Sequence, residues 1–189
     1  MTTTIQLRKG MTADAAAIHA LITANLNVGH LLPRTFEDIE SHAERFVVAV
    51  RGDAVIGCAE LAPLSSEVAE VRSLVVEEAS RGQRTGVSLV TALADRAREL
   101  GYVTLCAFTH QPAHFVRLGF SIVPHVWVPE KIALDCVGCS QFRQCGQYAV
   151  SLALRAGAGL RLEQTAPPAR AISGPRASVE RLRLLPITA

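Results

Sequence analysis

Apolar residues in the N-terminal part of the chain recur in patterns that predict one strand and two helices. Residues 5–8 alternate between apolar and polar side chains, as a half-buried strand does. Apolar residues within 15–22 recur at helical spacing after Asp14, an acidic residue that favours a helix start. Thr35 is followed by two acidic residues within the first turn, which is typical of a capped short helix reaching residue 44.

Three apolar runs in the next part of the chain predict an antiparallel meander. Residues 46–50 and 55–61 are joined by Arg51-Gly52-Asp53, a typical hairpin connection. A third run covers residues 68–76, after a break at 63–67. Because the connections are short, consecutive strands are expected to pair antiparallel.

The clearest helical pattern covers residues 86–100 and ends at Gly101. Its apolar face is made of Val87, Leu89, Val90, Leu93, Ala94 and Ala97. Strands are predicted at 102–109, 120–123 and 148–154, a short helix at 112–118, and an irregular insertion at 124–146. The order β-α-α-β-β-β-α-β-α-β-β predicts an α/β protein with a mixed, mostly antiparallel sheet and helices on both faces.

Composition fits one globular domain followed by a tail. Of 189 residues, 49% are hydrophobic and 19% charged, which is enough to bury a core. From residue 155 onward the sequence is rich in Ala, Arg and Pro and carries six Arg against two Glu. We therefore predict one domain over residues 1–154 and a disordered tail over 155–189.

Charge and hydropathy exclude several functional classes. The formal net charge of +2 gives no electrostatic footprint for nucleic acid. No apolar run reaches the roughly 18 residues that spanning a bilayer requires, and the N-terminus lacks the layout of a signal peptide. A cytoplasmic protein without nucleic-acid or membrane partners is expected.

The five cysteines argue against a disulfide framework, because their number is odd. Cys58 and Cys106 lie in apolar runs and are expected to be buried. Cys136, Cys139 and Cys145 form a spaced group in the insertion, which would need His125 to complete a zinc site. The alternative is a set of reduced thiols near a substrate mouth, and no metal is assigned.

A candidate anion site lies at Arg81-Gly82-Gln83-Arg84-Thr85-Gly86, between an apolar strand and the helix at 86–100. A glycine-bearing turn before a helix aims backbone N–H groups at one point, which the helix dipole makes attractive to phosphate. No Gly-Lys-Ser/Thr follows, so a P-loop is excluded, and Arg84 interrupts a dinucleotide fingerprint. What remains is a shorter phosphate cradle.

These motifs, together with Phe115-Val116-Arg117-Leu118-Gly119-Phe120, resemble the GCN5-related N-acetyltransferase (GNAT) superfamily over residues 4–154. In that family the turn holds the pyrophosphate of acetyl-CoA, the cosubstrate, and a splay between two central strands admits its pantetheine arm. Arg84 stands where the family usually has Gly. The positions that the resemblance assigns to the coenzyme are Leu74, Val75, Val76, Arg81, Gly82, Gln83, Arg84, Thr85 and Gly86.

Within the superfamily, the chain is most similar to the acetyltransferase domain of N-acetylglutamate synthases in a short, single-domain form. The stretches that carry this resemblance are Leu31-Leu32-Pro33-Arg34, Gly57-Cys58-Ala59-Glu60-Leu61, the strand opened by Glu70, Leu105-Cys106-Ala107-Phe108-Thr109 and Pro129-Glu130-Lys131.

The resemblance implies a role for each candidate site residue. Glu70 matches the base that deprotonates the amine, with Glu60 on the neighbouring strand as its rival. Many relatives have a Tyr acid where this chain has Phe115, so Thr109 is the expected acid, with His110 and His114 as reserves. Arg34 matches the arginine that binds the α-carboxylate, and the further substrate-binding candidates are Arg72, Ser73 and Arg143.

The sequence therefore predicts an acetyl-CoA-dependent N-acetyltransferase that converts L-glutamate to N-acetyl-L-glutamate, the first step of arginine biosynthesis. One alternative is a GNAT enzyme that acetylates another amino acid or a protein or peptide amine. The other is a non-catalytic acetyl-CoA-binding module. A homodimer is compatible with the sequence, which does not specify the oligomeric state.

Overall fold

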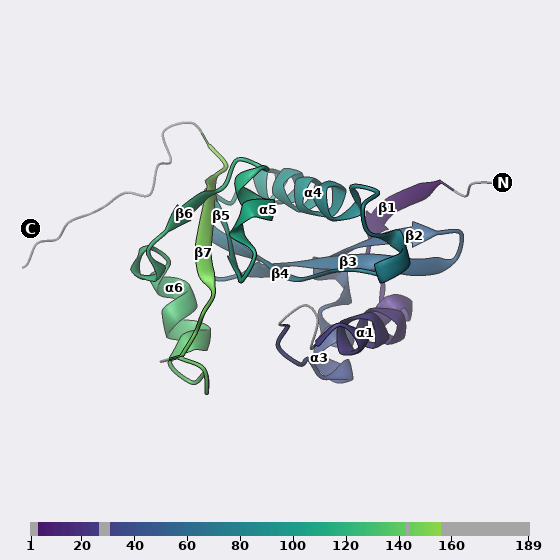
Figure 1. Ribbon diagram of the computed structural model, residues 1–189, viewed down its shortest axis with the longest axis horizontal. Coiled ribbons are helices and arrows are strands. Elements are labelled where there is room, and N and C mark those ends of the chain that lie inside the picture. Colours follow the sequence, from purple (N-terminus) through teal and green to yellow (C-terminus); the bar gives the residue numbers. More distant parts are fainter. Residues whose placement is uncertain (1–3, 27–30, 143, 156–189) are drawn as a thin grey trace, which may run out of the picture.

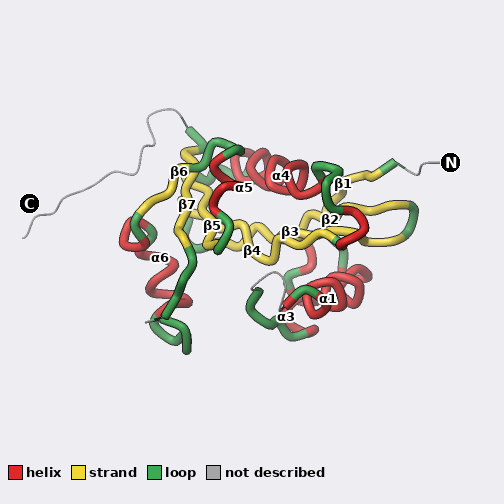
Figure 2. The backbone as a smooth tube through the Cα atoms, in the orientation of Figure 1, coloured by secondary structure: helices red, strands yellow, loops and turns green. Residues whose placement is uncertain are grey.

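The computed structural model describes residues 4–26, 31–142 and 144–155 of the chain. Within this part, one seven-stranded sheet has the order β1-β2-β3-β4-β5-β7-β6. Helices cover both of its faces, with α4 and α5 on one side and α1 and α3 on the other (Figures 1 and 2). The predicted α/β class and mixed sheet are confirmed, whereas the predicted tail at 156–189 lies outside the described residues.

The elements begin and end close to where the hydrophobic pattern predicts. The strands are β1 Ile5–Lys9, β2 Phe46–Arg51, β3 Ala54–Pro63, β4 Val68–Val76, β5 Thr104–Thr109, β6 Ser121–Val123 and β7 Tyr148–Ala153. The α-helices are α1 Ala15–Ala24, α3 Phe36–Ser41, α4 Thr85–Glu99, α5 Pro112–Val116 and α6 Pro129–Lys131. The pairs β1–β2, β2–β3 and β3–β4 are antiparallel, which confirms the meander.

Side-chain hydrogen bonds fix the start of the 3-10 turn Thr12–Asp14, which leads into α1, and the start of α3. Asp14 accepts a hydrogen bond from the Met11 N–H at 2.8 Å and two from the Arg8 guanidinium at 2.6 and 2.7 Å. Thr35 accepts from the Asp38 N–H at 3.2 Å, which confirms its predicted capping role. Each cap satisfies a backbone donor that the first helical turn leaves unpaired.

Each face of the sheet buries its own apolar cluster. The α4 side is formed by Leu89, Val90, Leu93, Ala94 and Ala97 together with inward-facing residues of β2–β5. The α1/α3 side is formed by Ile18, Ile22, Ile39, Phe46, Val48, Cys58 and Val75, among others. Burying each large aliphatic side chain contributes about 1.5–3 kcal/mol, so both helical layers are held mainly by these clusters.

A β-bulge in β4 changes which side chains face each cluster. Cys58 pairs with Val75 and Glu60 with Arg72, so β4 carries one more residue than β3 between these pairs. Ser73, at the bulge, has a φ of +49°. Because one extra residue reverses the alternation, Val71 packs on the α4 side whereas Val75 packs on the α1/α3 side.

The strands β4 and β5 are paired over only part of their lengths. They run parallel, and their register ends with the pair Glu70–Cys106. Beyond that pair β4 continues to Val76 and β5 to Thr109 without facing residues. Among the described residues, the edge of β4 that follows Glu70 therefore has no neighbouring strand on the β5 side.

The insertion between β6 and β7 is more regular than predicted. Residues 124–146 were expected to be irregular, but His125–Trp127 forms a 3-10 turn, followed by α6 and a π-helical turn at Ile132–Cys136. Pro129 opens α6, where a missing N–H has no consequence. Turns this short give no readable apolar period. Among the described helices, none has the length and apolarity needed to cross a membrane.

The hydrogen bonds of Asp14 should make the free energy of unfolding depend on pH. The Arg8 guanidinium lowers the pKa of Asp14, and the Met11 N–H adds to this against the opposing effect of burial. Replacing Asp14→Asn removes charged hydrogen bonds, so we expect the free energy of unfolding at pH 7 to fall by about 1.5–3 kcal/mol. The depressed pKa means that this stabilisation is present above the ordinary aspartate pKa of about 3.9 and is lost as pH falls through the folded-state value.

Urea unfolding of the wild type and D14N between pH 7 and pH 2.5 measures the effect. The two stabilities should converge at the acid end. Asp53→Asn, at an exposed position after β2, is the matched control and should change little at any pH. A D14N deficit that stays constant over the whole range would contradict the assignment.

Candidate active site

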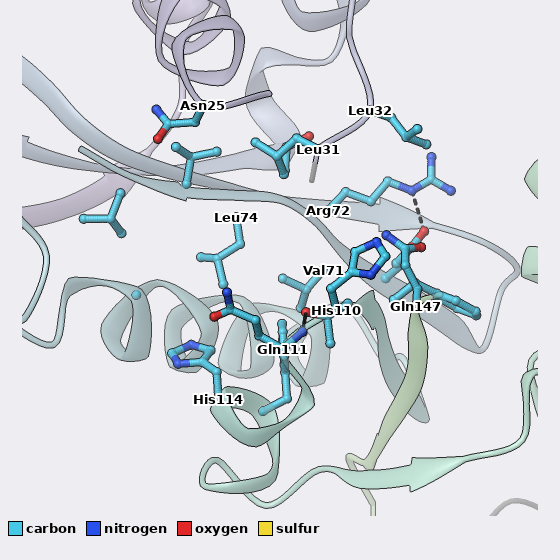
Figure 3. Close-up of a pocket in the computed structure, with 18 of the residues that line it drawn as sticks. Asn25, Leu31, Leu32, Val71, Arg72, Leu74, His110, Gln111, His114 and Gln147 are labelled. Carbon is cyan, nitrogen blue, oxygen red and sulfur yellow. Dashed lines mark hydrogen bonds and ion pairs between the residues drawn. The ribbon is translucent and has the colours of Figure 1, made fainter. Parts of the chain in front are cut away.

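A cleft of about 1200 Å³ opens where β4 and β5 separate. Its walls come from β4, the turn before α4, the end of β5, α5 and the insertion (Figure 3). It brings together most of the predicted site residues, namely Arg34, Glu70, Arg72, Ser73, Leu74, Val75, Val76, Arg81, Gly82, Arg84, Thr85, Gly86 and Thr109. Gln83 does not line it, since its Oε1 accepts from Arg51 Nη2 at 3.1 Å, and Arg143 lies outside the described residues.

The turn before α4 has the geometry of an anion cradle. Gly82 and Arg84 both adopt the left-handed region, with φ of +78° and +61°. The first N–H groups of α4 have no carbonyl one turn earlier, so they are available to an acceptor in the cleft. Arg81 is held beside them, donating to the Val76 carbonyl at 3.1 Å and to Asn25 Oδ1 at 2.7 Å.

Two polar groups next to this turn are buried without partners among the described residues. They are the hydroxyl of Thr85 and Nε2 of His114. A Cβ added at Gly86 would lie 3.6 Å from His114 Cε1, so the ring of His114 packs directly against the start of α4. Burial, with a smaller effect of Arg117, lowers the pKa of His114 and favours the neutral ring. A phosphate oxygen would satisfy the Thr85 hydroxyl.

The reacting end of the cleft contains a buried carboxylate held by two cations. Glu70 is only 3% exposed, and Lys131 Nζ lies 2.8 and 2.9 Å from its two oxygens. Arg72 also contacts it through Nε (Figure 3). The rival carboxylate, Glu60, is 1% exposed and bonds to Arg34, and it is not among the residues that line the cleft. The geometry therefore favours Glu70 over Glu60 for contact with a bound molecule.

Arg34 is fixed at the cleft by several partners. Its Nε lies 2.5 Å from Asp38 Oδ2, and its Nη1 lies 2.7 Å from Glu60 Oε2 and 3.3 Å from the Ser73 hydroxyl. Burial acts to lower the pKa of Arg34, but the bonds to the two carboxylates outweigh it and raise the pKa. Within the described part of the chain, Nη2 makes no hydrogen bond and keeps two donors for a ligand.

The end of β5 supplies a hydroxyl group and α5 an aromatic group. The Thr109 hydroxyl accepts from the Gln111 N–H at 3.0 Å, which leaves its own proton to donate. Phe115 is buried and lies edge-on to Phe120 at 5.2 Å, so it is a core residue. Figure 3 shows Leu74 pointing from β4 toward the side of the cleft that carries Gln111 and His114.

Sequence reasoning missed two charged residues of the insertion. Lys131 and Asp135 both line the cleft, and their ion pair measures 2.9 Å. Asp135 also contacts Arg72. Their opposite charges stand four residues apart, a spacing that brings two side chains together if the segment is helical. The sequence predicts an irregular segment here, so this spacing did not indicate a site.

The cysteines fall into two groups. Cys58 and Cys106 are buried as predicted, and burial raises the pKa of Cys58 to about 12, which makes it unreactive. Cys136, Cys139 and Cys145 line the cleft. Nε2 of His125 lies 2.8 Å from the Gln147 carbonyl, and no group of His, Cys, Asp and Glu in the described residues could hold a metal ion.

Comparison with known sequences gives consistent matches. The model of the acetyltransferase (GNAT) family matches residues 16–120. An uncharacterized N-acetyltransferase of Chlorobaculum tepidum is 31% identical over 144 residues, which covers 76% of this chain and 93% of that protein. The amino-acid acetyltransferase of Pseudomonas aeruginosa is 34% identical over 113 residues, covering 59% of this chain. The chain spans only 26% of the length of that second relative.

Solved structures share the fold. A Mycobacterium tuberculosis protein in complex with CoA has a TM-score of 0.68 and 24% identity, covering 79% of this chain and 99% of its own. The N-acetylglutamate synthase of Neisseria gonorrhoeae, complexed with coenzyme A and N-acetyl-glutamate, has a TM-score of 0.71 and 23% identity. That match covers 80% of this chain and 35% of the synthase.

The left-handed conformation of Arg84 should lower the free energy of unfolding. A non-glycine residue in this region costs roughly 1–2 kcal/mol. We expect Arg84→Gly to raise the free energy of unfolding by about 0.5–1 kcal/mol, since the greater freedom of Gly in the unfolded chain offsets part of the gain. The matched control is Arg98→Gly in the last turn of α4, which should lower it by about 1 kcal/mol. Urea unfolding measures both, and a destabilised R84G would contradict the prediction.

Proposed function

The chain belongs to the GNAT family of acetyltransferases, and from this we propose that it acetylates the amine of an amino acid, with L-glutamate as the preferred acceptor. It is an N-acetyltransferase with acetyl-CoA as cosubstrate. The observation that supports the acceptor site most directly is the buried Glu70 carboxylate at the point where β4 and β5 separate, in the same cleft as the anion cradle. The product would be N-acetyl-L-glutamate, the first intermediate of arginine biosynthesis.

The cosubstrate is bound by main-chain groups more than by side chains. The N–H groups of residues 82–86 and the Thr85 hydroxyl contact the pyrophosphate, where the dipole of α4 adds to the attraction. The gap between β4 and β5 admits the pantetheine arm and directs the thioester toward Glu70. N–H groups of Leu74 to Val76 donate to the thioester oxygen as negative charge develops on it.

Glu70 and Thr109 move the protons of the transfer. At pH 7 an α-amine is largely protonated, because its pKa is near 8. Glu70 removes a proton directly or through a water molecule, and the neutral nitrogen attacks the thioester carbon. The carbon–sulfur bond then breaks, and the Thr109 hydroxyl gives its proton to the departing sulfur. The transfer takes place in a ternary complex, without a covalent enzyme species.

Arg34, Arg72, Ser73 and Arg143 recognise the carboxylates of the acceptor. Arg34 has two unused donors on Nη2, and a guanidinium suits a carboxylate because it can donate two parallel bonds. Relatives whose names state amino-acid acetylation support an amino-acid acceptor. The catalytic unit is residues 1–154, and no catalytic role is assigned to residues 155–189.

Release of CoA thiol with a panel of amino acids and peptide amines tests the proposal. Glutamate should give the highest kcat/KM. If another amino acid or a peptide N-terminus gave the highest kcat/KM, the assigned acceptor would change and the assigned reaction, N-acetylation, would stay. Binding of acetyl-CoA without thiol release from any amine would favour the non-catalytic module.

Replacing Glu70→Gln should lower kcat by about 10²–10⁴-fold, because the amine then loses its proton acceptor. KM for acetyl-CoA should stay within about threefold of wild type, since the coenzyme does not depend on Glu70 for binding. Steady-state kinetics at saturating glutamate measure the change. Glu60→Gln is the comparison, and a larger kcat loss in E60Q than in E70Q would assign the base to Glu60.

Replacing Arg34→Ala should raise KM for glutamate by roughly 10–100-fold, the equivalent of one lost charged hydrogen-bonding group. KM for acetyl-CoA should change far less, because within the described residues Arg34 bonds to Asp38, Glu60 and Ser73 and to no residue of the turn before α4. Equal changes in both constants would remove its role as a carboxylate-binding residue. Arg98→Ala, in the last turn of α4 and outside the cleft, is the matched control.

A further inference from the structure

An internal carboxylate occupies the cationic end of the cleft. Asp135 contacts Arg72 through Nη2, and its Oδ2 lies 2.9 Å from Lys131 Nζ. Both cations also contact Glu70. Arg72 and Lys131 therefore form a pair of donors that holds two carboxylates at once, one from β4 and one from the insertion.

The two carboxylates differ in how firmly they are anchored. The Glu70 side chain is 4% exposed and belongs to a central strand. The Asp135 side chain is 35% exposed and belongs to a π-helical turn with no buried residue. A π-helical turn is an uncommon backbone form that is frequent at functional sites. Asp135 is thus the carboxylate that can leave with little loss of packing.

The cations share a single carboxylate, that of Glu70, once Asp135 leaves. The side chains of Lys131 and Arg72 are 12% and 27% exposed, and an excess positive charge at such positions is unfavourable. Burial acts to lower the pKa of Arg72, but its bonds and proximity to Glu70 and Asp135 outweigh it and raise the pKa. A second carboxylate is therefore favoured in the place of Asp135 when Asp135 moves.

We propose that Arg72 and Lys131 form a subsite for a carboxylate of the acceptor amino acid, and that Asp135 occupies this subsite until the acceptor displaces it. The proposal rests on the proposed function and identifies specificity-determining residues within it. When the acceptor carboxylate takes the place of Asp135, the number of ion pairs stays constant. The binding energy of the acceptor is therefore not spent on burying additional charges. A molecule without a carboxylate gains nothing at this place and has to leave Asp135 in position.

The opposite role for Asp135 gives the opposite result. If Asp135 bound the ammonium group of the acceptor, its removal would weaken the binding of amino acids and leave dicarboxylates without an amine unaffected. Glutarate separates the two cases, since it has the chain length and both carboxylates of glutamate but no amine.

Isothermal titration of glutarate into the full-length protein saturated with CoA tests the proposal. Asp135→Asn should bind glutarate about tenfold more tightly than wild type, because the ligand no longer competes with an internal carboxylate. Lys131→Met should bind it about tenfold more weakly. Glu130→Gln is the matched control, since it removes a carboxylate from the same helix that makes no ion pair with the described residues, and it should bind as wild type does.

Several outcomes would overturn the proposal. The first is glutarate binding by D135N that is unchanged or weaker than that of the wild type. The second is a gain in glutarate affinity in E130Q equal to that in D135N. The third is the absence of glutarate binding by every variant at a concentration on the order of 10 mM. Asp135→Ala should also bind glutarate more tightly than the wild type, which would show that the effect does not depend on the Asn side chain. Circular dichroism checks that each variant is folded. Thiol release is measured separately. An enzyme that acetylates no amino acid but follows the glutarate pattern would refute the proposed function alone.

Discussion

The extra residue in β4 is the constraint on which the rest of the site depends. It lies opposite β3 between the pairs Cys58–Val75 and Glu60–Arg72, with Ser73 held at a positive φ. Before it, Val71 faces α4, so Glu70 and Arg72 face the side from which Arg34 approaches. After it, Val75 joins the opposite cluster. The bulge thus lets one strand build the core on both faces and carry charged groups at the cleft.

The same strand separates from β5 just after Glu70. A sheet normally satisfies the N–H and C=O groups of a central strand from both sides. In the part of the chain that the structure describes, β4 has no strand neighbour on its β5 side after Glu70, and the cleft lies against that side. The fold thus places unpaired main-chain donors, the N-terminus of α4 and a buried carboxylate along one channel, which is the arrangement that a long molecule with a phosphate end and a reactive end requires.

The charges around Glu70 and Arg34 are balanced group by group. Glu70 is paired with Arg72 and Lys131, and Arg34 with Glu60 and Asp38. Buried charges are tolerated only when they are paired, so the site holds its cations ready by giving each an internal carboxylate. Binding of an anionic molecule then becomes an exchange of partners. In this way a cleft that contains several carboxylates would accept the negatively charged acceptor that we propose.

The sequence by itself determined the elements, their order and much of the cleft. Apolar periodicity located the meander and α4, and the Arg81–Gly86 motif located the cradle, because these signals depend on neighbours along the chain. Tertiary structure decided the rest. Lys131 reaches Glu70 from 61 residues away along the chain, and Asp135 reaches Arg72 from 63 residues away. The bulge at Ser73 reverses a face of β4, and the side chain of Gln83 bonds to Arg51. Such contacts follow from how a strand, a turn and an insertion pack in space, and local spacing carries no information about them.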